Sequence, residues 1–160
     1  MRSSLVRLFI WWLCLFGVLL VNACSTDKAP LTIYTIGDST MANKKSQVYP
    51  ETGWGQVLEN YVDGTVTVKN HARNGRSSKS FIDEGRWLVV LDSLETGDVV
   101  FIQFGHNDQK AYDSTRYTSP FGTYTDNLNK FVKETRERGA TPVLFTSIVR
   151  RKFGADGKLE

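Results

Sequence analysis

The sequence has little cysteine and little histidine, with two residues of each type among 160. Cys14 lies inside an N-terminal apolar segment and Cys24 follows that segment, so a chain cleaved before Cys24 has no partner for an internal disulfide. Any mechanism that needs an imidazole has only His71 and His106 available. The sequence also lacks a phosphate loop, a metal-ligand cluster, a haem motif and a nucleotide fingerprint. We therefore expect no cofactor and no metal site.

An excess of one charge is also lacking. Lys and Arg number 20 against 17 Asp and Glu, and without Arg2 and Arg7 the basic residues fall to 18. Such a balance does not mark a nucleic-acid binder, so we expect no nucleic-acid partner. Hydrophobic residues make up 41% of the chain and charged residues 23%, which excludes disordered and collagen-like classes. Residues 25–160 are enough for one domain with a real core.

The sequence has no apolar run long enough to cross a bilayer. The longest, Leu8 to Val21, has 14 residues and would span about 21 Å as a helix, against roughly 30 Å of hydrocarbon. Arg2 and Arg7 precede it, which is typical of a secretory signal peptide.

The residues that follow, Val-Asn-Ala-Cys-Ser at 21–25, resemble a bacterial lipobox. That resemblance implies export, cleavage before Cys24 and lipid attachment to its thiol, hence a membrane-anchored lipoprotein. An ordinary signal peptide or a short anchor is the alternative. The expected organisation is a lipoprotein-type signal peptide over 1–24, a tether over 25–30 and one domain over 31–160.

Hydrophobic periodicity predicts alternating strands and helices after the tether. Strands are expected over 31–36, 65–69, 99–104 and 142–149, and helices over 54–62, 77–94 and 124–135. Gly85 is expected to break the second helical region. The order predicts an α/β fold with a parallel sheet and helices on both faces.

Three polar loops follow the first three predicted strands, at 37–40, 70–76 and 105–108. The carboxyl ends of parallel strands share one edge of a sheet, and ligands of open α/β folds bind at that edge. If the first strand lies between the second and third, the three loops converge on one crevice. We expect the functional site there.

The residues of these loops suit acyl transfer. Ser39 presents a hydroxyl at a strand-to-helix turn, Asn107 offers an amide donor, and Gly75 lets a ligand approach its backbone N–H. With the N–H of Ser39, they would form an oxyanion hole of three donors. Each motif taken alone has an ordinary structural explanation: Ser39 as a helix N-cap, and the Gly75 and Asn107 loops as turns.

The three motifs in order resemble the SGNH (GDSL-type) hydrolases. TIYTIGDSTMA, NGRSSKSF and VFIQFGHNDQK are similar to the rhamnogalacturonan acetylesterase group, and the resemblance runs from about Leu31 to Val149. It implies a flavodoxin-like three-layer α/β/α fold with strand order 2-1-3-4-5. It implies Ser39 as nucleophile, and Ser39, Gly75 and Asn107 as oxyanion donors. The implied activity is a carboxylic ester hydrolase that removes acetyl esters from plant cell-wall polysaccharide. Asp38 and Asp108 are expected to support the turns.

The family's general base is a histidine in an Asp-x-x-His block after the fifth strand, and this sequence has no such block. His106 is expected to point away from the site that Asn107 enters, and His71 to have a structural or rim role. We therefore expect no general base here, and a domain that lacks its fifth strand and closing helix. The expected explanation is a fragment of a longer frame. A natural short lipoprotein that binds acylated glycan without cleaving it is the alternative.

Seven basic residues fall in the predicted edge loops: Lys44, Lys45, Arg73, Arg76, Lys79, Lys110 and Arg116. A basic rim suits an acidic, galacturonate-containing polymer, while the alternative is that loops are simply polar. The expected partners are an acetylated polysaccharide or oligosaccharide and a membrane reached through the lipid. The sequence does not fix an oligomeric state.

Overall fold

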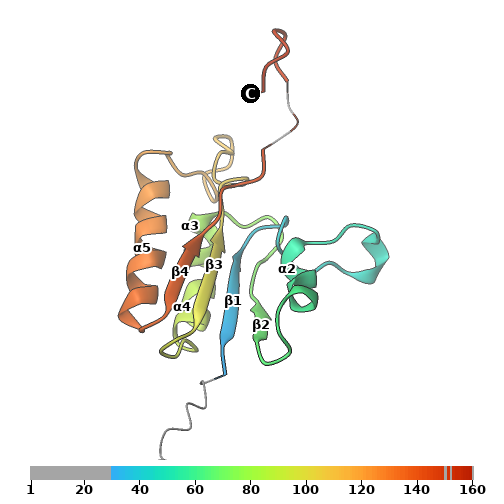
Figure 1. Cartoon of the computed structure of the whole chain (residues 1–160). Helices are drawn as coiled ribbons and strands as arrows, with labels where there is room; N and C mark the ends of the chain where they lie inside the picture. Colours follow the sequence, from blue (N-terminus) through green and yellow to red (C-terminus); the bar gives the residue numbers. More distant parts are fainter. Residues whose placement is uncertain (1–29, 150, 152, 160) are drawn as a thin grey trace, which may run out of the picture.

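The structure is a computed structural model that describes residues 30–149, 151 and 153–159. Its elements follow the chain in the order β1 (Thr32–Gly37), η1 (Ser46–Val48), α2 (Trp54–Val57), η2 (Leu58–Tyr61), β2 (Thr67–Asn70), α3 (Ser78–Asp83), α4 (Arg86–Leu91), β3 (Val99–Gln103), α5 (Thr123–Glu137) and β4 (Thr141–Leu144). Strands and helices alternate as the sequence predicts (Figure 1).

The four strands form one parallel sheet in the order β2-β1-β3-β4. The register places Thr32 opposite Thr67, and Val99 opposite both Ile33 and Thr141. This confirms the expected α/β fold and the first four positions of the expected strand order. It also places β1 between β2 and β3, which is the condition for convergence of the three loops.

The main core lies between the sheet and the helices α3, α4 and α5 (Figure 1). Alternate strand residues, such as Tyr34 and Ile102, point into it and meet Trp87, Phe104 and Phe131. The ring centroid of Phe131 lies 5.0 Å from that of Trp87 and 5.5 Å from that of Phe104. Each fully buried side chain of this kind contributes roughly 1.5–3 kcal/mol. This core fixes the strands whose carboxyl ends carry the polar loops.

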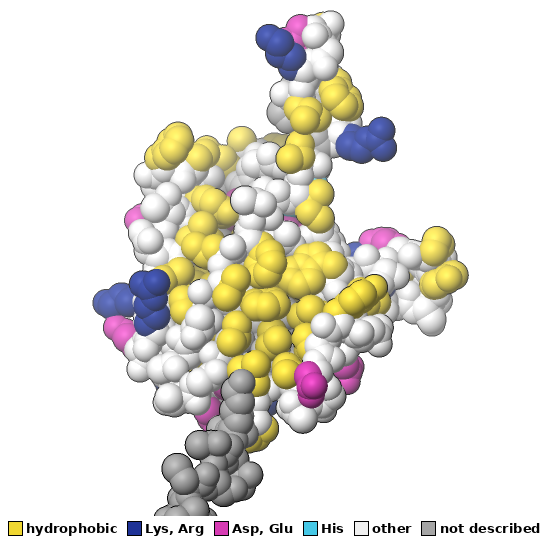
Figure 2. All heavy atoms as spheres, in the orientation of Figure 1, with side chains coloured by type: hydrophobic (Ala, Val, Ile, Leu, Met, Phe, Trp, Pro, Cys, Tyr) yellow, Lys and Arg dark blue, Asp and Glu magenta, His cyan; other side chains and the backbone are white. Residues whose placement is uncertain are grey.

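The opposite face of the sheet has a thinner cover, supplied by the short α2 and η2. Trp54 of α2 packs there against Phe101 and Phe145, with centroid separations of 6.4 and 5.3 Å. Figure 2 shows hydrophobic side chains gathered over this face. The helical layers on the two faces are therefore unequal within the part of the chain that the structure describes.

Two predicted elements differ most from the structure. The helix expected over 54–62 is a single α-turn followed by a 3₁₀ turn. The close packing of Gly53 and Gly55 on Met41 fixes the start of α2, and the exposed Tyr61 gives its end no core contact. The strand expected over 142–149 spans Thr141–Leu144, because its last ladder bond runs from the N–H of Phe145 to the carbonyl of Ile102. In contrast, the predicted break at Gly85 is confirmed, with a φ of 69°.

The predicted signal peptide, lipid site at Cys24 and most of the tether lie outside the described residues. Among residues 30–149, 151 and 153–159, no helix has the length and apolarity that a bilayer crossing requires.

Gly53 offers a test of the packing between α2 and the loop after β1. A Cβ at this position would meet the carbonyl oxygen of Ala42 and lie 2.7 Å from the carbonyl carbon of Met41. We expect Gly53→Ala to lower the free energy of unfolding by about 1–3 kcal/mol, because backbone cannot yield as a flexible side chain does. Urea unfolding measures this value.

Gly64→Ala is the matched control, since a Cβ at Gly64 has no neighbour within 4 Å. Its free energy of unfolding should stay within about 1 kcal/mol of the parent. Equal losses for both variants would contradict the packing described for Gly53.

Candidate active site

The three polar loops meet at the carboxyl edge of the sheet, at the top of Figure 1. The loop after β2 runs beside the end of β1, where the N–H of Arg73 donates to the carbonyl of Gly37 at 2.9 Å. The loop after β3 is joined to it by Asn107, whose Nδ2 donates to the carbonyl of Arg76 at 3.0 Å. The structure therefore brings the segments of Ser39, Gly75 and Asn107 to one edge.

Ser39 lies in a tight turn that Asp38 organises. The buried carboxylate of Asp38 accepts a hydrogen bond from the backbone N–H of Thr40 at 2.8 Å. The backbone carbonyl of Asp38 accepts one from the N–H of Ala42 at 3.0 Å. These bonds fix the backbone on both sides of Ser39. The Ser39 side chain is partly exposed, and neither its hydroxyl nor its N–H bonds to another described residue.

Gly75 adopts a φ of 76°, a conformation that favours glycine. It belongs to a turn in which the N–H of Arg76 donates to the carbonyl of Arg73 at 3.3 Å. The N–H of Gly75 donates to no other residue within the described part of the chain. A glycine here keeps a backbone donor accessible at the edge of the sheet.

Asn107 is 2% exposed, and its amide carries two N–H groups. One of them donates to the carbonyl of Arg76. This bond pins the amide against the Gly75 turn and leaves the second N–H without a partner among the described residues. The loop residues thus present unpaired donors to the same edge.

Asp108 anchors the loop that carries Asn107. Its buried carboxylate accepts from the N–H of Ser78 at 2.9 Å, the N–H of Gly105 at 3.0 Å and the hydroxyl of Thr118 at 3.1 Å. The hydroxyl of Ser78 is a fourth donor. Burial raises the pKa of this carboxyl, and the four hydrogen bonds act in the opposite direction. The expected supporting role of Asp108 agrees with these contacts.

The ring of His71 stacks on Tyr34, with centroids 5.8 Å apart. Burial, and then the charge of Lys69, lower the pKa of His71. These contacts agree with the structural role expected for His71.

His106 lies next to Asn107 in the sequence and is partly buried. Within residues 30–149, 151 and 153–159, no group of three or more potential ligands is placed to hold a metal ion.

Two polar residues that support the site were not singled out from the sequence. Asn70 accepts from the hydroxyl of Thr35 at 2.7 Å and donates to the carbonyl of Met41 at 3.0 Å, which ties β2 to the segment after Ser39. Gln103 accepts from the indole N–H of Trp54 at 2.7 Å and donates to the carbonyl of Thr146 at 3.0 Å. The available sign in both cases was a polar residue at the end of a strand, and for Gln103 that strand is largely buried.

Parallel strands in this order, with a serine turn after the first strand and amide donors after the next two, define an α/β domain with its ligand edge at the strand carboxyl ends. Residues 35–158 match the GDSL-like lipase/acylhydrolase family, and the chain belongs to that family.

Two relatives come from Bacillus subtilis (strain 168). The rhamnogalacturonan acetylesterase RhgT is 41% identical over 133 residues, which are 83% of this chain and 56% of RhgT. The probable rhamnogalacturonan acetylesterase YesY is 41% identical over 122 residues, which are 74% of this chain and 54% of YesY. The crystal structure of the Bacillus subtilis protein YxiM is similar with a TM-score of 0.66 and 28% identity, over 78% of this chain and 35% of YxiM. The chain thus spans about half the length of the two acetylesterases.

Asp108→Asn tests the anchor of the third loop. The new amide would place an N–H group against a donor, either Gly105 or Ser78, in a buried position. We expect the free energy of unfolding to fall by about 1–3 kcal/mol, the cost of an unsatisfied buried polar group. Chemical denaturation measures the change.

Asp63→Asn serves as the control, because the exposed Asp63 accepts from the N–H and hydroxyl of Thr65 in a similar turn. Its effect should stay within about 0.5 kcal/mol. An equally small effect at Asp108 would show that its buried hydrogen bonds do not stabilise the fold.

Proposed function

We propose that the chain provides the nucleophile and oxyanion hole of a serine esterase that removes acetyl groups from pectin-type polysaccharide. The observation that carries this proposal is a set of groups at one edge that have no partner among the described residues: the hydroxyl and N–H of Ser39, the N–H of Gly75 and an amide N–H of Asn107. Membership of the acylhydrolase family supports the same reaction class.

The chemistry follows from those groups. The Ser39 hydroxyl gives its proton to a general base, and its oxygen attacks the acetyl carbonyl carbon to form the tetrahedral intermediate, whose oxyanion accepts hydrogen bonds from Ser39 N–H, Gly75 N–H and Asn107 Nδ2. Collapse of this intermediate breaks the ester C–O bond, and the sugar oxygen leaves with that proton. Water then hydrolyses the acetyl-serine to acetate and free Ser39. Donors held in place before the reaction stabilise developing charge without reorganisation, and one such donor is worth about 10²–10³ in kcat. The bond from Asn107 to Arg76 and the φ of Gly75 are the features that would hold two of these donors.

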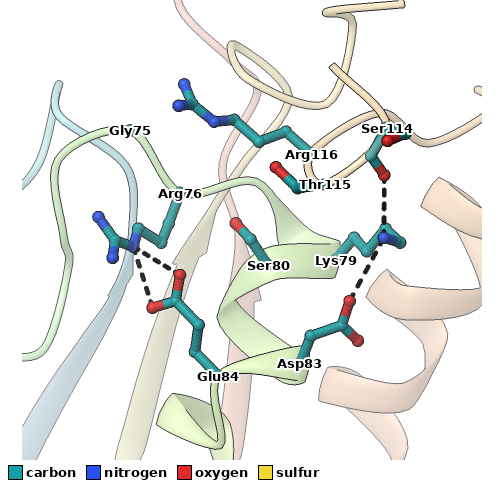
Figure 3. Close-up of a pocket in the computed structure, with 9 residues that line it drawn as sticks. All are labelled: Gly75, Arg76, Lys79, Ser80, Asp83, Glu84, Ser114, Thr115 and Arg116. Atoms are coloured by element: carbon teal, nitrogen blue, oxygen red, sulfur yellow. Dashed lines mark hydrogen bonds and ion pairs between the residues drawn. The ribbon is translucent and has the colours of Figure 1, made fainter.

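The substrate class rests on the relatives and on the loops. RhgT is named a rhamnogalacturonan acetylesterase and YesY a probable one. The polymer's name denotes a chain that contains galacturonate, a uronic acid, and an acetylesterase acts on acetyl groups. Arg76, Lys79 and Arg116 lie beside Gly75 in the groove of Figure 3, where a negatively charged polymer would find cations. We infer an acetylated, acidic polysaccharide or oligosaccharide as substrate.

Removal of the Ser39 proton requires a general base. The stacking of His71 on Tyr34 gives that ring a packing role, and its described contacts do not include Ser39. We infer that the base is supplied by polypeptide outside the described residues, consistent with a chain that spans 56% of RhgT. Loss of the base costs on the order of 10⁴–10⁶ in turnover, so the chain as printed should be nearly inactive.

We further propose export and membrane anchoring through a lipid on Cys24. The support is the sequence pattern of Arg2, Arg7, the apolar run from Leu8 to Val21 and the lipobox-like residues before Cys24.

Joining the chain to the part of RhgT that follows the matched stretch tests the missing base. We expect acetate release from acetylated rhamnogalacturonan to rise by about 10⁴-fold or more over the printed chain. Released acetate is measured enzymatically, and an extension in which every histidine is replaced by alanine is the control. Equal rates for the printed and joined chains would contradict the inference.

Ser39→Ala in the joined protein tests the nucleophile. Its kcat should fall by on the order of 10⁴–10⁶, because the covalent step is lost. Ser93→Ala is the control: Ser93 follows α4, away from the polar loops, and its hydroxyl donates to the carbonyl of Val89 within that helix. An unchanged rate in Ser39→Ala would refute the nucleophile. Saturable binding of the acetylated polymer without acetate release would instead favour a glycan-binding protein.

A further inference from the structure

A groove of about 450 Å³ lies beside Gly75, between the loop after β2, helix α3 and the loop after β3 (Figure 3). Its cationic side chains are those of Arg76, Lys79 and Arg116. Because the groove begins at Gly75, it continues from the proposed reacting centre. A polymer whose acetyl group lies at Ser39 would therefore place a neighbouring unit in this groove.

All three cations pair with a carboxylate, and Arg76 and Lys79 each also donate to a backbone carbonyl. The Nε of Arg76 lies 3.1 Å from both carboxylate oxygens of Glu84, and its Nη1 donates to the carbonyl of Asn74 at 3.0 Å. The Nζ of Lys79 lies 3.4 Å from Asp83 and donates to the carbonyl of Ser114 at 3.0 Å. These pairs, drawn as dashed lines in Figure 3, neutralise both carboxylates that line the groove.

Arg116 differs from these two cations. Its Nε pairs with Asp113 at 3.0 Å, within a turn where the N–H of Arg116 also donates to the carbonyl of Asp113 at 3.0 Å. These contacts fix the stem of the side chain. Its two terminal nitrogens, Nη1 and Nη2, have no hydrogen-bond partner among the residues described.

The free end of Arg116 is directed toward the proposed oxyanion hole. Figure 3 shows the guanidinium extending away from Thr115 toward the loop that carries Gly75. A methyl group placed on the Cα of Gly75 would lie 3.8 Å from Nη1 of Arg116. The parallel N–H groups of a guanidinium end match the two oxygens of a carboxylate, and such charge-assisted pairs are stronger than neutral hydrogen bonds.

We propose that Arg116 is a specificity-determining residue that binds the carboxylate of a uronic acid next to the acetylated sugar. The choice of ligand rests on the proposed function, since it assumes an acidic polysaccharide at this edge. The recognition itself needs no ester cleavage. Binding and acetate release are therefore separate tests.

The experiment measures binding of trigalacturonate, and of the neutral trisaccharide maltotriose, to the full chain by calorimetry. The parent should bind trigalacturonate more tightly than maltotriose. Arg116→Gln should raise the Kd for trigalacturonate on the order of 10-fold, the loss expected for a charge-assisted hydrogen-bond pair, and leave maltotriose unchanged. Arg116→Lys should fall between the two because it keeps the charge and loses the fork.

Arg138→Gln is the matched control, because Arg138 is an exposed arginine paired with Asp92 at 3.4 Å beyond the other end of the strands. It should bind trigalacturonate as the parent does. The proposal is overturned if Arg116→Gln binds trigalacturonate unchanged, if both trisaccharides weaken equally, or if the parent binds neither. Equal competition by inorganic phosphate would also overturn it, since that would indicate an unselective anion site.

The outcome is independent of the esterase assay. An Arg116-dependent preference for trigalacturonate without acetate release in the joined protein would refute the esterase and support the carboxylate site. Acetate release without that preference would do the reverse. Thermal melting of each variant excludes unfolding as the cause of weaker binding.

Discussion

The carboxylate of Asp108 lies buried where the loop after β3, the start of α3 and the segment before α5 meet. Its donors, the Ser78 N–H and hydroxyl, the Gly105 N–H and the Thr118 hydroxyl, come from parts of the chain as far as 30 residues away. Burial alone would favour the neutral acid, so these hydrogen bonds are what make the site tolerable for a carboxylate. The next residue along the chain is Asn107, whose position follows from the same anchor.

Within the described residues, the unpaired groups of the proposed site lie at the edge where the strands end. Other polar groups at the strand ends are paired across long sequence separations, as Asn70 is with Thr35 and Gln103 with Trp54. An unpaired donor costs little where water reaches it, as at the partly exposed Ser39 and Gly75, and it becomes available when a ligand displaces that water. The sheet therefore combines a well-satisfied interior with a reactive rim, and the positive φ of Gly75 keeps one donor accessible there.

Much of this arrangement could be predicted from the sequence, because it depends on local patterns. The apolar run 99–104 and the spacing of Tyr124, Leu128 and Phe131 indicated β3 and α5, and polar loops after strands indicated the edge. The roles of Asn70 and Gln103 could not be predicted, because they depend on side-chain contacts 29–49 residues apart. The length of β4 also depends on its neighbour, since its ladder with β3 ends at the pair of Ile102 and Leu144. The free end of Arg116 could not be predicted either. It depends on which carboxylates pair with the other cations, and the spacing of residues in the sequence does not determine that.

Strand β4 lies at the outer edge of the described sheet, and its inward N–H groups include those of Thr141 and Phe145, which donate to Asp98 and Ile102. Because successive N–H groups of a strand point to opposite sides, those at positions 142 and 144 would point away from β3. Pro142 has no N–H, so Leu144 carries the one amide of β4 that faces outward. An edge that has lost half of its donors is a poor template for pairing between molecules, in the way that proline protects natural edge strands. Within the described residues, Pro142 thus weakens β4 as a template for pairing between molecules, even though the neighbouring Phe145 is exposed.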